Sequence, residues 1–204
     1  MEPYPKILSL FKRDPKTHKL IEGHYCRPEF EYLASCEWSM TEKIDGMNIR
    51  VMWDGTEVTF AGRTNDAQLP LHLLESLAEG FKPEALARVF DGPACLYGEG
   101  YGAKIQRGGK YIADRADFML FDVMVDGWWL RRKDMLDVAS KLGIQSAPLV
   151  WTGQIADAVR LITGIGVPSA FGDFLAEGLV LRPTTDLFAR NGERIIAKIK
   201  HKDF

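Results

Sequence analysis

The stretch Met40-Thr-Glu-Lys-Ile-Asp-Gly-Met-Asn-Ile-Arg-Val51 sets Lys43 beside a carboxylate and a glycine, at the mouth of an expected strand. A lysine amine attacks an electrophile such as phosphorus only when it is unprotonated, and its reference pKa of about 10.4 leaves it charged at neutral pH. Burial, a neighbouring cation or a metal-bound substrate can lower that pKa. Asp45 is a candidate to recruit the metal, and Gly46 lets backbone approach a ligand closely. We therefore expect the chemistry at Lys43.

The pattern Lys-x-Asp-Gly is weak evidence on its own. A chain of this length contains it by chance about one time in twenty, given average residue frequencies. The alternative interpretation is a solvated lysine before a turn. Any function therefore has to rest on further motifs downstream.

Length and composition favour a single intracellular domain. A chain of 204 residues is one large domain or two small ones, and we expect one. There is no run of eighteen apolar residues and no signal-peptide pattern, so we expect a soluble, cytoplasmic protein.

Three cysteines without Cys-x-x-Cys spacing predict neither a disulfide framework nor a zinc site, although His24 near Cys26 is a weaker metal candidate. The net charge of −2 disfavours binding nucleic acid by overall charge but leaves a local basic groove open.

The first half of the chain predicts a hairpin next to the lysine. Residues 1–41 indicate an irregular lead-in with a helical turn near 28–34. Alternating apolar residues on both sides of Asp54-Gly55 predict a β-hairpin over 47–61, which would turn Lys43 and Arg63 toward the same end. Two short helices are expected within 68–90. A strand from Ala94 then runs into a glycine-rich turn that carries Glu99, where the flanking glycines would allow close approach to a nucleotide.

The second half predicts alternating strands and helices. Strands are expected over 117–123, 147–152, 176–182 and 195–200, and helices over 131–142, closed by Gly143, and 154–163. Glu177 is an isolated carboxylate that leads its strand. Lys198 and Lys200 lie two apart and so share one face, which is unfavourable unless an anion lies between them. Two groups of basic residues are candidates for a hydrated face or for nucleic-acid contact: Lys104, Arg107, Lys110 and Arg115, then Arg131, Arg132 and Lys133.

Six motifs together resemble a known superfamily. In chain order they are Lys43-Ile-Asp-Gly46, Gly62-Arg-Thr64, Tyr97-Gly-Glu-Gly100, Leu120-Phe-Asp122, Glu177-Gly-Leu-Val180 and Lys198-Ile-Lys200. Their order and spacing resemble those of the covalent nucleotidyltransferases, and among these the ATP-dependent polynucleotide ligases. The Tyr-Gly-Glu form and the closing Lys-x-Lys look most like the second bacteriophage RNA ligase family and its bacterial and protist relatives.

The resemblance implies a fold and a reaction. The fold is α+β, a nucleotidyltransferase (ATP-grasp-like) domain in which two mostly antiparallel sheets and flanking helices enclose a nucleotide pocket. Lys43 would attack the α-phosphate of ATP, expel pyrophosphate and form lysyl-AMP. The AMP would pass to a 5′-phosphate end, which a 3′-hydroxyl then seals. Each step is displacement at phosphorus, which needs alignment and charge neutralisation.

The resemblance also implies a role for each motif residue. Lys198 and Lys200 would contact the α-phosphate, and Glu177, with Asp45 as a second candidate, would hold Mg²⁺ or Mn²⁺. The remaining roles are as follows: Glu99 accepts from the ribose hydroxyls, Phe121 stacks on adenine, Arg63 steadies the ribose or the phosphates, and Glu42 accepts from the adenine amino group.

Several alternatives remain open. A DNA ligase core uses the same nucleophile, a capping guanylyltransferase uses GTP, and a non-catalytic nucleotide-binding module would bind ATP without a covalent adduct. An NAD-dependent ligase is disfavoured, because only 42 residues precede Lys43. We expect no oligonucleotide-binding or helical domain after the closing Lys-x-Lys, which makes sealing less certain than adenylylation. The expected partner is RNA or a nicked duplex with 5′-phosphate and 3′-hydroxyl ends, bound by a monomer without membrane contact.

Overall fold

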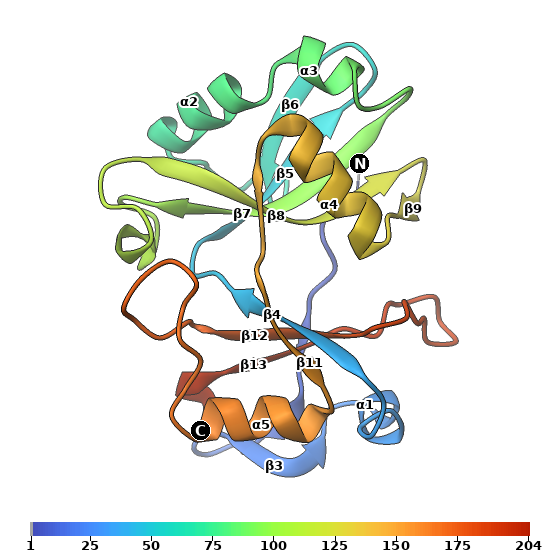
Figure 1. Cartoon of the computed structure of the whole chain (residues 1–204), viewed down its shortest axis with the longest axis vertical. Coiled ribbons are helices and arrows are strands. Elements are labelled where there is room, and N and C mark those ends of the chain that lie inside the picture. The colour runs from blue at the N-terminus through green and yellow to red at the C-terminus, as the bar shows by residue number, and fades with distance from the viewer. Residues whose placement is uncertain (1) are drawn as a thin grey trace. The chain divides into compact units, whose positions relative to one another are not determined.

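The computed structural model describes residues 2–204 (Figure 1). By its internal contacts the chain forms two compact units. The first unit comprises the N-terminal residues up to Pro5 together with Ile44–Ala147, and the second comprises Lys6–Lys43 with Pro148–Phe204. The chain therefore passes between the units at three points, one of them immediately after Lys43. The expectation that 1–204 form one nucleotidyltransferase domain stays a prediction.

The first unit is built on a six-stranded sheet of order β10-β8-β7-β5-β6, in which β9 also pairs with β8. Its strands are β5 (Met47–Trp53), β6 (Val58–Gly62), β7 (Ala94–Gly102), β8 (Ala116–Val125), β9 (Trp128–Trp129) and β10 (Gln145–Ser146). Only β10 runs parallel to its neighbour. Its helices are α2 (Leu71–Gly80), α3 (Pro83–Ala87), the short 3₁₀ turn η1 (Gly108–Lys110) and α4 (Arg132–Leu142).

Alternation in the β5–β6 hairpin fixes which face of this sheet is buried. Ile49, Val51 and Trp53 point into an apolar core, where they meet Leu73 of α2 and Met135 of α4. The turn matches the sequence prediction, because Asp54 accepts hydrogen bonds from two backbone amides beyond it. The two short helices and the helix that ends at Gly143, which adopts a left-handed conformation with φ of 66°, are also confirmed.

The second unit is built on a five-stranded sheet of order β1-β13-β12-β4-β11 and a separate β2–β3 ribbon. Its strands are β1 (Leu8–Ser9), β2 (Phe11–Arg13), β3 (Leu20–Tyr25), β4 (Trp38–Lys43), β11 (Leu149–Gly153), β12 (Gly178–Pro183) and β13 (Ala197–Lys200). Its helices are α1 (Pro28–Tyr32), α5 (Ile155–Thr163) and the 3₁₀ turn η2 (His201–Asp203). All pairings are antiparallel except that of β1 with β13.

One face of this sheet is apolar and is covered by α5. Trp38 and Met40 of β4 and Leu179 of β12 are fully buried there, and they share a core with Ile155 and Ile162 of α5. The opposite face carries the intervening residues of the same strands. The α+β class and the mostly antiparallel sheets are thus confirmed.

One expectation about the chain needs correction. Residues 1–41 contain three strands and most of β4 rather than an irregular lead-in, since short strands whose partners are distant in sequence leave little periodic pattern. Lys43 precedes the hairpin and Arg63 follows it, as expected. Lys43 is the last residue of β4, pairs with β12 and belongs to the second unit, whereas Arg63 follows β6 in the first. The expectation that the two residues turn toward the same end stays a prediction.

Candidate active site

Lys43 and Lys200 lie in one row of the five-stranded sheet. The register pairs Gly178 of β12 with Lys43 of β4 on one side and with Lys200 of β13 on the other. Residues directly opposite each other on neighbouring antiparallel strands project from the same face. Both lysine side chains therefore rise from the face opposite α5, separated only by a residue without a side chain.

Gly178 is required at the centre of this row. A Cβ atom there would come within 2.1 Å of the carbonyl oxygen of Ile199 and within 2.8 Å of the Cα atom of Lys200, both of them backbone atoms. No rotamer change could relieve that overlap. The glycine thus permits the close pairing of β12 with β13 that brings the two lysines together.

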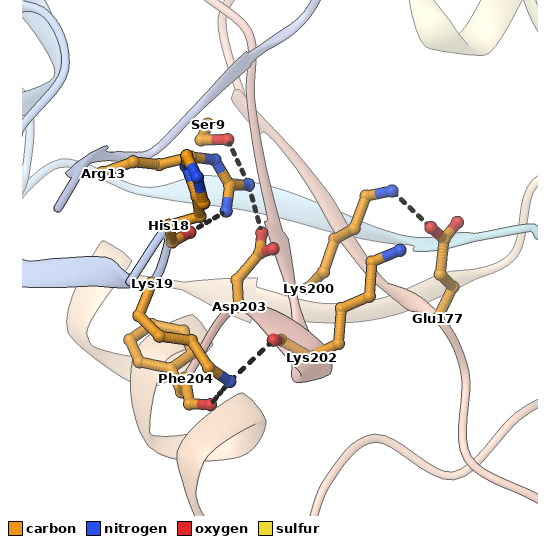
Figure 2. A network of polar contacts seen from close by, with 9 residues as sticks. All are labelled: Ser9, Arg13, His18, Lys19, Glu177, Lys200, Lys202, Asp203 and Phe204. Atoms are coloured by element: carbon orange, nitrogen blue, oxygen red, sulfur yellow. Dashed lines mark hydrogen bonds and ion pairs between the residues drawn. The ribbon is translucent and has the colours of Figure 1, made fainter. Parts of the chain in front are cut away.

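Glu177 joins the two lysines. Its Oε2 atom lies 2.6 Å from Lys43 Nζ, and its Oε1 atom accepts a hydrogen bond from Lys200 Nζ (Figure 2). The three side chains are only 13–19% exposed. Burial by itself raises the pKa of the Glu177 carboxyl, but the charges and hydrogen bonds of Lys43 and Lys200 outweigh burial, and its pKa is lowered overall. Glu177 is therefore ionised at neutral pH.

This cluster describes a resting arrangement for Lys43. An adjacent carboxylate favours the charged form of an amine, and an ammonium group has no lone pair with which to attack phosphorus. For Lys43 to act as a nucleophile, it must leave Glu177 and lose a proton. The geometry therefore links the protonation state of Lys43 to whether Glu177 stays paired with it.

Glu177 can serve as the ligand of a divalent cation only if a bound substrate supplies further ligands. Within residues 2–204 no group of three His, Cys, Asp or Glu side chains could hold a metal ion. Mg²⁺ in nucleotide sites is commonly held by one or two carboxylates plus substrate phosphates and water, and a single carboxylate meets that need. Asp45, the second candidate ligand, belongs to the first unit, where its backbone amide donates to the hydroxyl of Tyr111.

Lys198 accompanies Lys200 on the same face of β13. Both are partly exposed, while Ala197 and Ile199, which alternate with them along the strand, are fully buried, as the alternation predicted. Lys198 pairs in register with Val180 of β12 and with Ser9 of β1. Lys198 therefore lies two residues along the sheet from the row that holds Lys43 and Lys200, in the next row that projects from the same face.

Glu42 points to the opposite face from Lys43. Its side chain is buried, and its carboxylate accepts hydrogen bonds from Ser169 Oγ at 2.7 Å and from the backbone amide of Ala170 at 2.9 Å. Both oxygens thus hold the loop that precedes β12. Acceptance from an adenine amino group stays a prediction, and this geometry gives Glu42 a second interpretation as the anchor of that loop.

Glu99 lies within a strand rather than in a turn, which corrects the sequence interpretation. β7 continues to Gly102, and the glycines on either side of Glu99 face the core of the first unit. A Cβ on Gly98 would strike the ring of Phe118 at 2.2 Å, and one on Gly100 would meet Leu73 at 2.8 Å. These glycines make room for packing, so they do not mark a nucleotide loop.

The opposite face of β7 brings Glu99 next to a residue that sequence reasoning missed. Asn48 of β5 pairs in register with Glu99, so the two side chains share that face. The Asn48 Oδ1 atom is buried without a hydrogen-bond partner among the described residues. Such an atom is a candidate ligand contact. The sequence signal was present, since Asn48 lies two residues beyond the Lys-x-Asp-Gly motif.

Phe121 is the extra residue of a β-bulge. Tyr97 pairs with Asp122 and Gly98 with Leu120, which leaves Phe121 without an opposite residue. Bulges re-aim side chains, often beside functional sites. The edge-to-face contact with Tyr4, at 4.9 Å between ring centroids, supports the half-buried Phe121 ring. Tyr4 also donates to the buried Asp122 at 2.5 Å. Sequence reasoning missed this N-terminal contribution.

Arg63 is exposed just beyond β6, at the start of a loop that is held by hydrogen bonds from the buried Arg50. Arg50 of β5 is fully buried and donates to the carbonyl of Gly62 at 2.9 Å and to Asn65 Oδ1 at 2.7 Å. An arginine in a strand normally indicates a solvated face, so sequence reasoning missed this role. The basic residues at 104, 107, 110 and 115 are all exposed.

Two mostly antiparallel sheets, one of which carries the lysine cluster, define a nucleotidyltransferase-type fold. Residues 36–200 match the RNA ligase family, and the chain belongs to that family.

Solved structures of an RNA ligase from Naegleria gruberi are similar to this chain. A mutant with AMP and Mn has 16% identity and a TM-score of 0.69, and covers 99% of this chain. A mutant with ATP and Mn has 18% identity and a TM-score of 0.69 over 97% of it. A structure with pyrophosphate has 16% identity and a TM-score of 0.68 over 99%. The chain spans only 57–58% of the length of these three chains, so the likeness shows the fold.

Proposed function

We propose that this protein is an ATP-dependent RNA ligase. It would transfer AMP from ATP to Lys43, then from Lys43 to a 5′-phosphate end, and would seal that end to a 3′-hydroxyl. One observation carries the proposal: within a chain of the RNA ligase family, Lys43 and Lys200 lie in one sheet row and share the carboxylate of Glu177. The ATP, AMP and Mn named with the similar Naegleria ligase support the choice of substrate and metal.

Lys43 is the proposed nucleophile. After releasing a proton to solvent, its Nζ atom would form a bond to the α-phosphorus while the bond from that phosphorus to the bridging oxygen of pyrophosphate breaks. Pyrophosphate takes the electron pair, and the nitrogen releases a second proton to solvent. Lys200 and Lys198 face the same side of the sheet and would neutralise the α-phosphate oxygens. Glu177 would hold Mg²⁺ or Mn²⁺, which when bound supplies charge neutralisation at the phosphates.

The first unit supplies the other proposed contacts. Glu99 would accept from the ribose hydroxyls, Phe121 would stack on adenine, and Arg63 would steady the ribose or the phosphates. In the described part of the chain no helix has the length and apolar character needed to cross a membrane. A nucleic-acid substrate follows the family. The monomeric state and the cytoplasmic location expected from the sequence stay predictions.

Intact-mass measurement after incubation with ATP and Mg²⁺ tests the first step. We expect one added AMP, mapped to Lys43 by peptide sequencing, and none on Lys43→Ala. Lys141→Ala is the matched control, because Lys141 is a surface lysine of α4 that pairs with Asp137. An adduct on another lysine, or ATP binding without any adduct, would overturn the proposal.

A further inference from the structure

The second unit contains a cavity of about 510 Å³ beside Lys198 and Lys200. It is lined by residues of β1, β2, β13 and η2 and by the segment that leads into β1. Most of its polar lining is basic, namely Lys6, Lys12, Arg13, Lys198, Lys200 and Lys202. Among the described residues that line it, Asp203 is the one acidic residue. None of the candidate roles derived from the sequence uses Lys6, Lys12, Arg13 or Lys202.

The cavity carries a concentration of positive charge. Asp203 is paired with Arg13 at 2.9 Å, and Glu177, outside the lining, is paired with Lys200. Lys6, Lys12 and Lys202 form no ion pair with any residue between 2 and 204. The chain as a whole has a net charge of −2, so this local excess is not a consequence of composition. Like charges gathered around a cavity favour a bound anion.

The basic wall is held in place by a polar network (Figure 2). Besides Asp203, Arg13 contacts the carbonyl of His18 at 2.8 Å and Ser9 Oγ at 3.2 Å. Lys19 donates to the carbonyl of Lys202 at 3.0 Å and to that of Phe204. The β2–β3 ribbon therefore ties down the chain that follows Lys200. Asp203, which is buried, is the acceptor at the centre of this network.

Strand order places the cavity on the far side of the lysine pair from Lys43. Across the sheet the sequence of strands is β4, β12, β13 and β1, so Lys43 and Lys200 arise from backbones roughly 10 Å apart. The cavity extends beyond β13 to β1 and β2. An α-phosphate held between Lys43 and the pair Lys198 and Lys200 would therefore have its opposite side facing the cavity.

Displacement at phosphorus is roughly in line, so the entering and leaving groups lie on opposite sides. When Lys43 enters, pyrophosphate leaves from the side opposite Lys43. When AMP is later transferred, an oxygen of the 5′-phosphate forms the new bond to phosphorus, the bond to Lys43 breaks, and the amine takes the electron pair and a proton. The incoming 5′-phosphate must then occupy the side that pyrophosphate has left.

We propose that this cavity is a phosphate site that serves both steps. It would bind pyrophosphate while Lys43 is adenylylated and the 5′-phosphate of the strand while AMP leaves Lys43. Lys12 and Lys202 line it as binding residues. The inference rests on the proposed function and deepens it, because two chemically similar ligands would use the same lysines in turn.

Calorimetric titration with pyrophosphate tests binding separately from catalysis. The background is the full chain carrying Lys43→Ala, which can form no adduct, in a chelating buffer that keeps pyrophosphate free of metal. Lys12→Ala and Lys202→Ala should each weaken binding roughly tenfold, the effect of losing about 1.4 kcal/mol. Lys16→Ala, an exposed lysine outside the cavity lining, should leave it unchanged. Equal effects of all three variants, or no effect of the first two, would overturn the site.

The shared role needs a second measurement. With Lys43 present and already adenylylated, Lys12→Ala and Lys202→Ala should slow single-turnover transfer of AMP to a 5′-phosphorylated oligoribonucleotide about tenfold, while Lys16→Ala transfers normally. Normal transfer combined with weakened pyrophosphate binding would overturn the shared role. If the protein with Lys43 never forms lysyl-AMP, the proposed function fails and takes the shared role with it, whereas the titration still shows whether the cavity binds a phosphate anion.

Discussion

Lys43 and Lys200 contact the same carboxylate, one on each oxygen, although their strands are separated by β12. The two lysines enclose the partly buried carboxylate of Glu177, which is also the predicted metal ligand. The Glu177 carboxylate is therefore compensated by two cations of the protein itself, and substrate binding must rearrange these ion pairs. This relationship determines what substitutions in the cluster should do.

Glu177→Gln should make stability less sensitive to acid. Because the pKa of Glu177 in the folded protein is lowered below its unfolded value, the folded state binds fewer protons. Its stabilising contribution is present above the unfolded pKa and is lost as pH falls through the folded pKa. Melting temperatures measured from about pH 6 to about pH 3 should fall less steeply for the variant than for the parent protein. Parallel curves would contradict the assignment.

The same variant should lose adenylylation by roughly a hundredfold or more, as expected on removing a main electrostatic group. An initial-rate assay at limiting Mg²⁺ measures this. Glu29→Gln serves as a control, since Glu29 lies on α1 in the same unit, away from the cluster. A near-normal rate for Glu177→Gln would rule out a role in metal binding.

Lys198→Ala and Lys200→Ala should both reduce lysyl-AMP formation, and Lys200→Ala should also reduce stability. Lys200→Ala removes one of the two cations that compensate the partly buried Glu177 carboxylate, so we expect a loss of about 1–3 kcal/mol in unfolding free energy. Thermal unfolding and adduct formation should be measured on the same samples. If both variants adenylylate normally, the phosphate site lies elsewhere.

Gly178→Ala should disrupt the site by altering the strand pairing that positions Lys43 and Lys200. The added methyl group overlaps backbone of β13, so the strands must separate, at a typical cost of about 1–3 kcal/mol for overpacking. Because the shift moves Lys200 relative to Lys43, adenylylation at a temperature where the variant is folded should fall as well. Gly80→Ala is the control, since nothing lies within 4 Å of the Cβ it would add. Normal activity in folded Gly178→Ala would show that adenylylation does not need the alignment of Lys43 and Lys200 on either side of Gly178.

The sequence predicted those parts of the fold that depend on neighbours along the chain. The β5–β6 hairpin follows from local alternation around an Asp-Gly turn, and the helix that ends at Gly143 from its cap. It could not predict β1, whose two residues are strand only because they pair with β13 near the other end of the chain. Nor could it show that Arg50 is buried, since its partners lie in a loop whose path depends on tertiary structure.

The candidate site, like the fold, has features that the sequence predicted and features that it could not predict. Motif spacing brought Lys43, Glu177, Lys198 and Lys200 together as candidates. The structure places the three lysines on β4 and β13 of one sheet and Glu177 immediately before β12, the strand that lies between them. The ion pairs of Glu177 follow from strand register, which motif spacing does not determine. The opposite orientation of Glu42 follows from simple alternation along β4 and was available from the sequence.

The preference for RNA is the last prediction. The exposed basic residues Lys104, Arg107, Lys110 and Arg115 can contact phosphates, and such contacts give affinity without sequence preference that falls steeply with salt. Distinguishing RNA from DNA requires a contact that senses the 2′-hydroxyl or A-form geometry near the sealed end. Since the chain belongs to the RNA ligase family, we expect pre-adenylylated protein to seal a nick with ribonucleotides on the 3′-hydroxyl side faster than the all-DNA nick. Single-turnover sealing of two nicks matched in sequence measures this, with AMP transfer to the 5′-phosphate followed separately. Equal or faster sealing of the all-DNA nick would indicate a DNA ligase and leave the adenylylation chemistry at Lys43 unaffected.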